Sequence, residues 1–178
     1  MIDIGLFGMN QEIREILQYL ENREDYVIWA GFASFAHFGF DCSPDIDIFT
    51  NSFETKEKMS LDFQKNNWKV IPHNKTYQNW DKLKKHETTF DIVYSQNASK
   101  LFFTDKVKIE VYRHSLNFIS KEVLFLTKLG QLSDIDRSKE KRERDLKTIM
   151  ESRKSVDVRK IKELILKLPA SYWLTGWV

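Results

Sequence analysis

Features that mark secreted, membrane-bound and disordered proteins are scarce in this chain of 178 residues. Cys42 is the only cysteine, so no intrachain disulfide can form. No apolar run approaches the ~20 residues of a membrane-spanning helix, and residues 1–9 lack the basic start of a secretory signal peptide. With three prolines and six glycines, the chain also has no flexible Gly/Ser linker. We therefore expect a soluble cytoplasmic protein without a membrane partner.

The chain also lacks a strong excess of one charge. Its formal net charge is +2, which predicts neither strong attraction to a polyanion nor repulsion from one. Apolar residues make up 42% and aromatic residues 13%, with 13 Phe and five Trp, so the sequence can form a core and is not of the disordered type. The length suits one domain, or a compact core with a small helical lobe.

The hydrophobic pattern predicts a mixed α/β (α+β) core over residues 1–115 and a helical lobe over residues 116–178. Helical spacing begins after Asn10, a plausible N-cap, at Ile13, Ile16, Leu17 and Leu20. The other elements expected in the core are strands at 26–30, 45–49, 68–72, 89–94, 101–104 and 107–112, helices after Gly31 and at 52–67, a loop or short helix at 73–88, and a hairpin turn at Asp105-Lys106. The lobe is expected to be helical from Ser120, with a last helix lined by residues from Val156 to Leu168 and ended by Pro169.

Two aspartates in the segment 26–50 are the strongest chemical signal. Successive side chains of a strand point to opposite faces, so Asp45 and Asp47 share one face, with Cβ atoms roughly 6.5 Å apart. Paired carboxylates at that spacing can bind a hard divalent cation such as Mg²⁺ or Mn²⁺. Asp-x-Asp also occurs on ordinary solvated faces. Here, however, apolar neighbours predict burial, where carboxylates are costly unless a metal ion or hydrogen bonds compensate them.

The glycine at the end of the preceding apolar run has a physical use in binding an anion. Gly31 lets the backbone turn tightly from the strand into a helix, whose first N–H groups and dipole then favour an anion. Ser34 can add a hydroxyl. His37, in the same helix, is more often a structural polar residue than a ligand, and Cys42 is more often a bystander thiol than a nucleophile.

The pattern of these residues resembles the signature of the nucleotidyltransferase superfamily: apolar, Gly, Gly or Ser, about ten residues, then Asp-apolar-Asp-apolar. It is similar, more narrowly, to the AbiEii/AbiGii toxin-like nucleotidyltransferases. The matching residues are Ala30-Gly31-Phe32-Ala33, Gly39, and Asp41-Cys42-Ser43-Pro44-Asp45-Ile46-Asp47. Ala30 stands where that group has its first glycine, and Asp41 stands where a basic residue is usual. The resemblance implies a mixed sheet flanked by helices, a nucleotide at Gly31, Ser34 and Ser43, and catalytic metal ligands at Asp45 and Asp47.

The superfamily also has a third carboxylate on a later strand, in the pattern apolar-Asp/Glu-apolar. Two segments of this chain fit, Phe90-Asp91-Ile92 and Ile109-Glu110-Val111. Each is equally consistent with an outward acid on a half-buried strand. Asp91 and Glu110 therefore remain alternatives as the third metal ligand.

A second part of the resemblance lies near the C-terminus. Residues 119–128 fit the group's apolar-Ser-x-Glu-x-Leu stretch that leads to a lysine, and Arg137 with residues 141–146 fits its later Arg and Lys-Asp-x-x-Asp-Leu stretch. By this alignment Lys128 and Asp145 match catalytic positions. Lys128 can neutralise a triphosphate and Asp145 can orient it. The alternative for Lys128 is an ordinary solvated lysine on an amphipathic helix.

The resemblance implies metal-dependent transfer of a nucleoside monophosphate from a nucleoside triphosphate (NTP) to an acceptor. By analogy with the group, the acceptor is RNA or tRNA in a toxin or phage-defence role, with a cognate antitoxin protein as a partner. The basic run 137–144 can contact the phosphates of RNA. Glu140 and Glu143 lie within the run, however, so it is also consistent with an ordinary surface on which acidic and basic side chains form salt bridges. The competing interpretation is a catalytically silent interaction protein that uses its Trp-rich tail, 171–178, as a contact surface.

Overall fold

The computed structural model describes residues 10–39, 46–71 and 79–167. Its described part contains a seven-stranded mixed sheet in the order β3-β4-β5-β2-β1-β7-β6. The strands are β1 Tyr26–Trp29, β2 Ile46–Thr50, β3 Lys69–Ile71, β4 Trp80–Lys85, β5 Thr88–Val93, β6 Lys106–Val111 and β7 His114–Ile119. The helices are α1 Gln11–Leu20, α2 Ala30–Phe38, α3 Phe53–Lys65, α4 Gln96–Thr104, α5 Lys121–Leu132, α6 Lys139–Ser152 and α7 Val158–Lys167. Among these helices none is long and apolar enough to cross a membrane.

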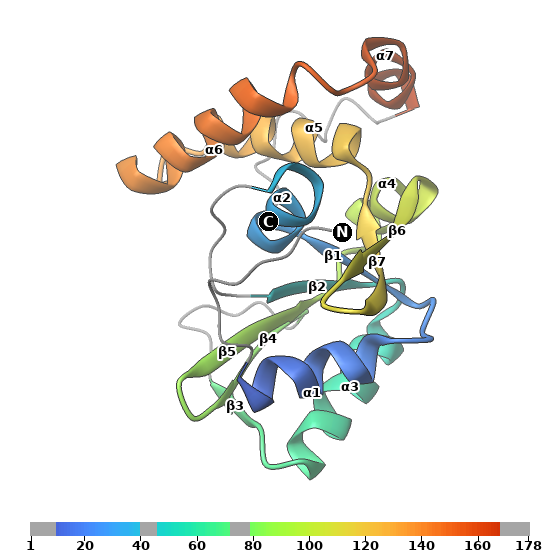
Figure 1. Ribbon diagram of the computed structural model, residues 1–178, viewed down its shortest axis with the longest axis vertical. Helices are drawn as coiled ribbons and strands as arrows, with labels where there is room; N and C mark the ends of the chain where they lie inside the picture. Colours follow the sequence, from blue (N-terminus) through green and yellow to red (C-terminus); the bar gives the residue numbers. More distant parts are fainter. Residues whose placement is uncertain (1–9, 40–45, 72–78, 168–178) are drawn as a thin grey trace.

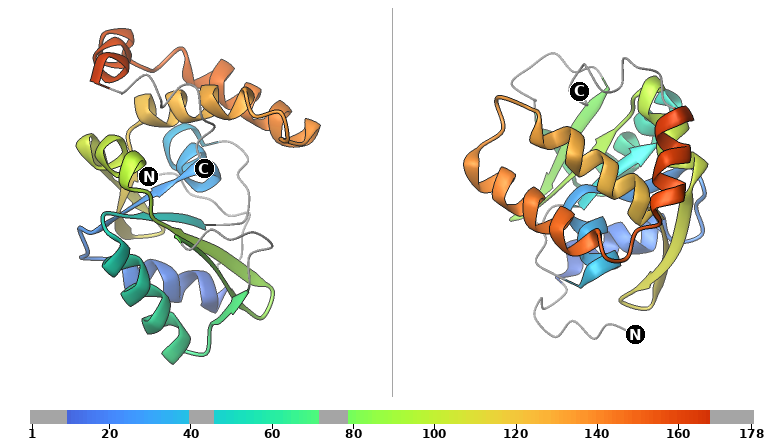
Figure 2. Two further views of the ribbon diagram at one scale, coloured as in Figure 1. Left: turned by 180° about the vertical axis from the view of Figure 1, so that it is seen from behind. Right: turned by 90° about the horizontal axis from the view of Figure 1, so that it is seen from above.

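Helices cover both faces of the sheet. The two views of the ribbon place α1 and α3 on one side, and α2, α5 and α6 on the other (Figures 1 and 2). On the first side, Phe63 of α3 packs edge-on against Phe90 of β5, with ring centroids 4.7 Å apart. On the second side, Phe102 of α4 packs against Phe49 of β2, with centroids 4.6 Å apart, and against Trp29 of β1. The sheet is therefore the middle layer of one continuous core.

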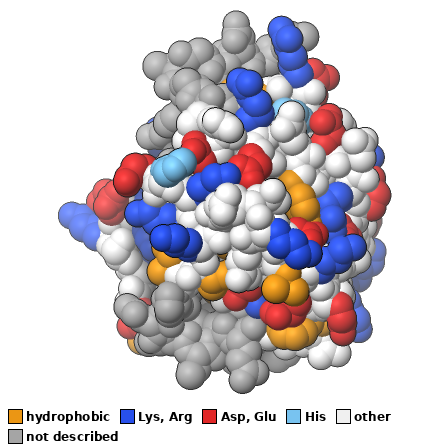
Figure 3. Space-filling model, turned by 90° about the horizontal axis from the view of Figure 1, so that it is seen from below, with side chains coloured by type: hydrophobic (Ala, Val, Ile, Leu, Met, Phe, Trp, Pro, Cys, Tyr) orange, Lys and Arg blue, Asp and Glu red, His pale blue; other side chains and the backbone are white. Residues whose placement is uncertain are grey.

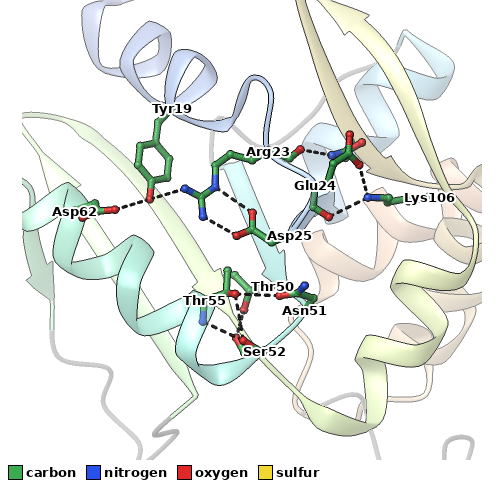
Figure 4. A network of polar contacts seen from close by, with 11 residues as sticks. Tyr19, Arg23, Glu24, Asp25, Thr50, Asn51, Ser52, Thr55, Asp62 and Lys106 are labelled. Atoms are coloured by element: carbon green, nitrogen blue, oxygen red, sulfur yellow. Dashed lines mark hydrogen bonds and ion pairs between the residues drawn. The ribbon is translucent and has the colours of Figure 1, made fainter.

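A polar network ties α1 to the strands and to α3 (Figure 4). Arg23, just after α1, donates to both carboxylate oxygens of Asp25, at 3.0 Å from Nε and 2.6 Å from Nη2. The same guanidinium donates to the hydroxyl of Tyr19, which in turn donates to Asp62 of α3 at 3.0 Å. These contacts hold the two helices over one face of the sheet.

Most elements expected from the sequence are confirmed, including two helix caps. Asn10 accepts a hydrogen bond from the Ile13 N–H at 2.8 Å, and Ser120 accepts one from the Val123 N–H at 3.2 Å. The change from sheet to consecutive helices falls after Ile119. The division into a core and a lobe remains a proposal.

Three expected elements near the middle of the chain are wrong. Residues 101–104 belong to helix α4, because Ala98, Leu101 and Phe102 are buried at helical spacing behind a Ser95 cap. Residues 80–85 form strand β4 instead of a loop or short helix. The segment has so little apolar character that only Leu83 is fully buried.

The hairpin near residue 105 is also placed differently. Strand β6 pairs with β7, an element that the apolar pattern before Ser120 did not predict, and the turn is at Tyr112-Arg113 instead of Asp105-Lys106. Both turn residues have positive φ, 51° and 69°, as the favoured two-residue hairpin turns require. No glycine or asparagine marks the turn in the sequence, which is why the pattern missed it.

The junction between β1 and α2 has a strained backbone. Ala30, the first residue of α2, has φ +55°, in the left-handed region that a side chain disfavours. A left-handed conformation costs an L-residue about 1–2 kcal/mol relative to glycine. Trp29 precedes the helix as its N-cap and makes no side-chain cap hydrogen bond. The first N–H groups of α2 thus have no side-chain acceptor from their own N-cap residue.

We predict that Ala30→Gly stabilises the protein. Glycine removes the left-handed strain from the folded state. It also makes the unfolded chain more flexible, which lowers the free energy of unfolding by about 0.4–1 kcal/mol. The net gain should be up to about 1 kcal/mol, a rise in Tm of about 2–4 °C at this chain length. The matched control is Ala33→Gly, three residues further along the same helix and fully buried, which should lower stability by about 1 kcal/mol or more. Thermal unfolding measures both variants. An equal loss of stability in Ala30→Gly and Ala33→Gly would contradict the strain at Ala30.

Candidate active site

Asp47 and Asp91 lie side by side on neighbouring strands. β2 and β5 run parallel, and their register pairs Asp47 with Asp91, between the pairs Ile46–Phe90 and Ile48–Ile92. Neighbouring strands are about 4.8 Å apart and register partners point to the same face. Asp91 is 7% exposed, so this carboxylate is held largely out of water. The structure thus brings together two of the acids that the sequence singled out.

These two acids belong to a longer row of side chains across the sheet. Lys82 of β4 is the register partner of Asp91, and Trp29 of β1 is the register partner of Asp47. The row therefore reads Lys82, Asp91, Asp47, Trp29 over four adjacent strands; we call it the transverse row. The Lys82 Nζ lies 3.9 Å from Asp91 Oδ1. The buried Trp29 Nε1 has no hydrogen-bond partner among the described residues, so its indole N–H is a donor left open beside Asp47.

Helix α2 starts where the transverse row ends. It begins immediately after Trp29, so Gly31 lies in its first turn, one residue beyond the strained Ala30. The first N–H groups of a helix have no partner within the helix and favour an anion. Ser34 is 3% exposed and its hydroxyl donates to the Ala30 carbonyl at 3.1 Å. Gly31 therefore lies in the first turn of the helix as expected, but the left-handed residue of the turn is Ala30 and not Gly31. The Ser34 hydroxyl is directed into its own helix.

A buried ion pair joins two of the C-terminal helices, α5 and α6. Lys128 of α5 donates to Asp145 Oδ1 of α6 at 2.7 Å, and Arg137 Nε donates to the other carboxylate oxygen. Lys128 is 7% exposed and Asp145 is 1% exposed. The loop between the two helices is fixed at the same time, because Arg137 also donates to the Gln131 amide oxygen at 3.2 Å. Lys128 is therefore not an ordinary solvated lysine on the surface of an amphipathic helix, which was the alternative drawn from the sequence.

Electrostatics connects the ion pair to the acids. Burial lowers the pKa of Lys128 below its ordinary value, while the Asp145 carboxylate acts in the opposite direction and favours the ammonium. Asp47 is a second carboxylate that raises the pKa of Lys128, so the two side chains are within electrostatic reach across the gap between α5 and the sheet. This is consistent with Lys128 and Asp145 approaching the site from the helices, as the sequence predicted.

Glu110, the alternative third acid, lies elsewhere. It is on β6, at the far edge of the sheet, where its register partner is Ser115. Three strand spacings, about 14 Å, separate that strand from β2. Of the two alternatives, only Asp91 is beside Asp47.

The acids present suit a hard divalent ion. Carboxylate oxygens are the ligands that Mg²⁺ and Mn²⁺ prefer, and Asp47 and Asp91 supply them from adjacent strands. Within the described residues no group of three or more Asp, Glu, His or Cys side chains forms a metal site. Asp45, which is expected to complete the set, lies outside the described residues, as do Asp41, Cys42, Ser43 and the tail 171–178.

Other candidate residues have structural surroundings. The His37 Nε2 donates to the Ile119 carbonyl at 2.7 Å, and burial lowers the pKa of the ring, which favours its neutral form. Sequence reasoning missed Lys82 and Trp29. Lys82 fell in a segment read as a loop or short helix, and Trp29 appeared only as part of an apolar run. The segment from Trp80 to Lys85 has no apolar alternation, so its sequence carries no strand signal that could have pointed to Lys82.

Comparison with known proteins supports the fold. The sequence matches no model of a known protein family and no curated protein. The lincosamide antibiotic adenylyltransferase LnuA, in its lincomycin-bound form, is 19% identical with a TM-score of 0.58, over 79% of this chain and 96% of LnuA. An antigenic nucleotidyltransferase-like protein from Paracoccidioides brasiliensis is 12% identical with a TM-score of 0.58, over 85% and 83%. The antibiotic-resistance factor ANT(2'')-Ia is 12% identical with a TM-score of 0.56, over 79% of each chain. The chain therefore has the nucleotidyltransferase fold, which confirms the expected mixed sheet with flanking helices.

We predict that Asp145→Ala destabilises the protein strongly. The substitution leaves the buried Lys128 ammonium and the neighbouring Arg137 without their shared carboxylate, and breaking one side of a buried ion pair costs about 3–5 kcal/mol. The matched control is Glu143→Ala, on the same helix, whose partner Lys139 lies 3.9 Å away on the surface. Loss of an exposed pair costs less than about 1 kcal/mol. Similar losses in the two variants, measured by urea unfolding, would show that removal of Asp145 does not leave an uncompensated charge in the core.

Proposed function

We propose that this protein transfers a nucleoside monophosphate from an NTP to a hydroxyl-bearing acceptor, with Mg²⁺ or Mn²⁺. The observation that carries the proposal is the pairing of Asp47 with Asp91 beside the start of α2, opposite the buried ammonium of Lys128. A negatively charged pair with a helix N-terminus and a lysine nearby fits a metal-bound triphosphate better than a structural role. The nucleotidyltransferase fold supports the same reaction, although a shared fold alone does not establish an activity.

In this proposal each residue has a distinct task. Asp45, Asp47 and Asp91 hold the divalent ion, which when bound offsets charge on the reacting phosphates and lowers the pKa of the acceptor hydroxyl. The N–H of Gly31 and the others in the first turn of α2 point to the triphosphate, with Ser43 a further candidate contact. Lys128 adds positive charge on the side of α5, and Asp145 keeps its ammonium protonated and oriented.

The proposed reaction is a displacement at the α-phosphorus of the NTP. The acceptor oxygen forms a bond to the α-phosphorus, the bond from that phosphorus to the bridging oxygen breaks, and pyrophosphate leaves with the electron pair. The acceptor proton passes to a carboxylate, and Asp91 is the acid best placed to receive it, because it lies beside Asp47 on the same face.

For the acceptor we favour a small organic molecule over RNA. Two relatives of the fold are described with an antibiotic, LnuA with lincomycin and ANT(2'')-Ia with adenylyl-2''-tobramycin. In the basic run 137–144, Arg137 is bonded to Asp145, and Arg142 donates to backbone carbonyls of 134, 135 and 137. These two arginines serve the fold, which weakens the case for an RNA-binding strip.

The face seen from below, away from α5 and α6, offers no alternative RNA-binding surface. Acidic and basic side chains of the described residues are intermixed over it, without a broad patch of one sign (Figure 3). The gathering of Lys and Arg that is usual in nucleic-acid-binding proteins is thus not seen on this one face. RNA, tRNA and the toxin role with an antitoxin partner, as in the AbiEii/AbiGii group, remain the second candidate. It is tested in the same experiment.

The test is transfer of label from NTPs that carry it on the α-phosphate, in Mg²⁺ or Mn²⁺, to total RNA or to hydroxyl-bearing small molecules. We predict transfer by the wild type and a loss of about 100-fold or more in Asp47→Asn and Asp91→Asn, because both acids contact the reacting groups. Glu110→Gln, which removes the alternative acid, is the matched control and should keep wild-type activity. Asp47→Asn should retain or gain thermal stability, since it relieves repulsion between adjacent carboxylates.

Two results would contradict the proposal. Loss of activity in Glu110→Gln but not in Asp91→Asn would place the reaction at another acid. Absence of Mg²⁺-dependent binding of labelled NTP to the wild type would favour the catalytically silent interaction protein instead.

A further inference from the structure

Lys82 is placed against an acid of the candidate metal site without being required by the proposed reaction. Its Nζ lies 3.9 Å from Asp91 Oδ1, and the two residues are register partners of the antiparallel pair β4–β5. The Lys82 side chain is 31% exposed and that of Asp91 is 10% exposed, so the pair lies at the border between core and solvent. The positive charge of Lys82 at this position would repel a metal ion bound at Asp91.

The strand that carries Lys82 is anchored from its other face. Asp81, the preceding residue, points toward α3, where it forms a 2.7 Å ion pair with the buried Lys56 and accepts a 2.5 Å hydrogen bond from Ser60. Because side chains alternate along a strand, fixing Asp81 on one face fixes the origin of Lys82 on the other. Lys82 is thus directed to the transverse row by the fold.

A lysine here conflicts with a second metal ion. Two-metal sites for phosphoryl transfer place their ions about 3.5–4 Å apart, on shared carboxylates. A divalent ion bound to Asp91 Oδ1 at about 2.1 Å would lie no farther than about 6 Å from the Lys82 ammonium in its present position. The ammonium also neutralises part of the Asp91 charge that would attract such an ion, and it repels the ion at that distance. Lys82 therefore lowers the affinity of Asp91 Oδ1 for a second divalent ion.

We propose that Lys82 takes the place of a second metal ion at Asp91, so that the protein binds one divalent ion with its NTP instead of two. This inference rests on the proposed function, because it concerns the same site. Lys82 is then a positioning residue: it holds Asp91 and supplies one positive charge in place of the two that an ion would bring.

The experiment counts bound Mn²⁺ by electron paramagnetic resonance, in the presence of an NTP analogue with a methylene group between its α- and β-phosphates. The wild type should bind one Mn²⁺ per protein–analogue complex. Lys82→Met, which removes the charge and keeps much of the length, should bind a second ion at least tenfold more tightly than the wild type does. Lys82→Gln is a second neutral variant, and Lys82→Arg should keep the count of one.

Lys84→Met is the matched control. Lys84 lies two residues along the same strand, on the same face, but its register partner is Thr89 and its nearest acid is Glu87 at 4.0 Å. Removal of this equal charge should leave the count at one.

Several outcomes would overturn the proposal. A count of two in the wild type, or the same count in Lys82→Met as in the wild type and Lys84→Met, would show that the lysine does not replace an ion. A weaker affinity for the analogue in Lys82→Met, with an unchanged Mn²⁺ count, would assign the ammonium to the phosphates. Absence of both Mn²⁺ and analogue binding in every protein would instead remove the proposed function, and is distinguishable because the analogue is measured separately.

Discussion

The register of β2 against β5 is the constraint on which the site depends. It places Asp47 beside Asp91 and so sets two carboxylates next to each other at the edge of an apolar core. Like charges at that spacing are unfavourable unless cations or hydrogen bonds compensate them. Two lysines supply compensating positive charge, Lys82 from the neighbouring strand and Lys128 from α5. β4 and the C-terminal helices thus each contribute a positive charge to this pair of acids.

The C-terminal helices contribute by holding a lysine where it would otherwise be costly. Burial disfavours the Lys128 ammonium, and the Asp145 carboxylate, itself bonded to Arg137, offsets part of that penalty. Such an arrangement adds little to stability compared with an apolar core. It is more consistent with a requirement for positive charge facing Asp47, and this connects the packing of α5 and α6 to the proposed reaction.

Much of this could be predicted from the sequence, where local signals and burial agree. Asn10 and Ser120 began their helices as expected, and the strand around Asp47 follows from apolar alternation. What could not be predicted depends on pairing between distant strands. No local pattern states that Asp91 and not Glu110 is the partner of Asp47, since both have apolar neighbours. The polar strand β4 was missed for a related reason, because neighbouring strands and the anchor at Asp81 hold it in place more than its own apolar residues do.

The most direct test of the central claim is a crystal structure with Mn²⁺ and a non-hydrolysable NTP analogue, in which anomalous scattering locates the ion. The account predicts an ion within about 2.2 Å of a carboxylate oxygen of Asp47, with the triphosphate between the start of α2 and the Lys128 ammonium. An ion bound away from both Asp47 and Asp91, or a nucleotide on another surface, would contradict it.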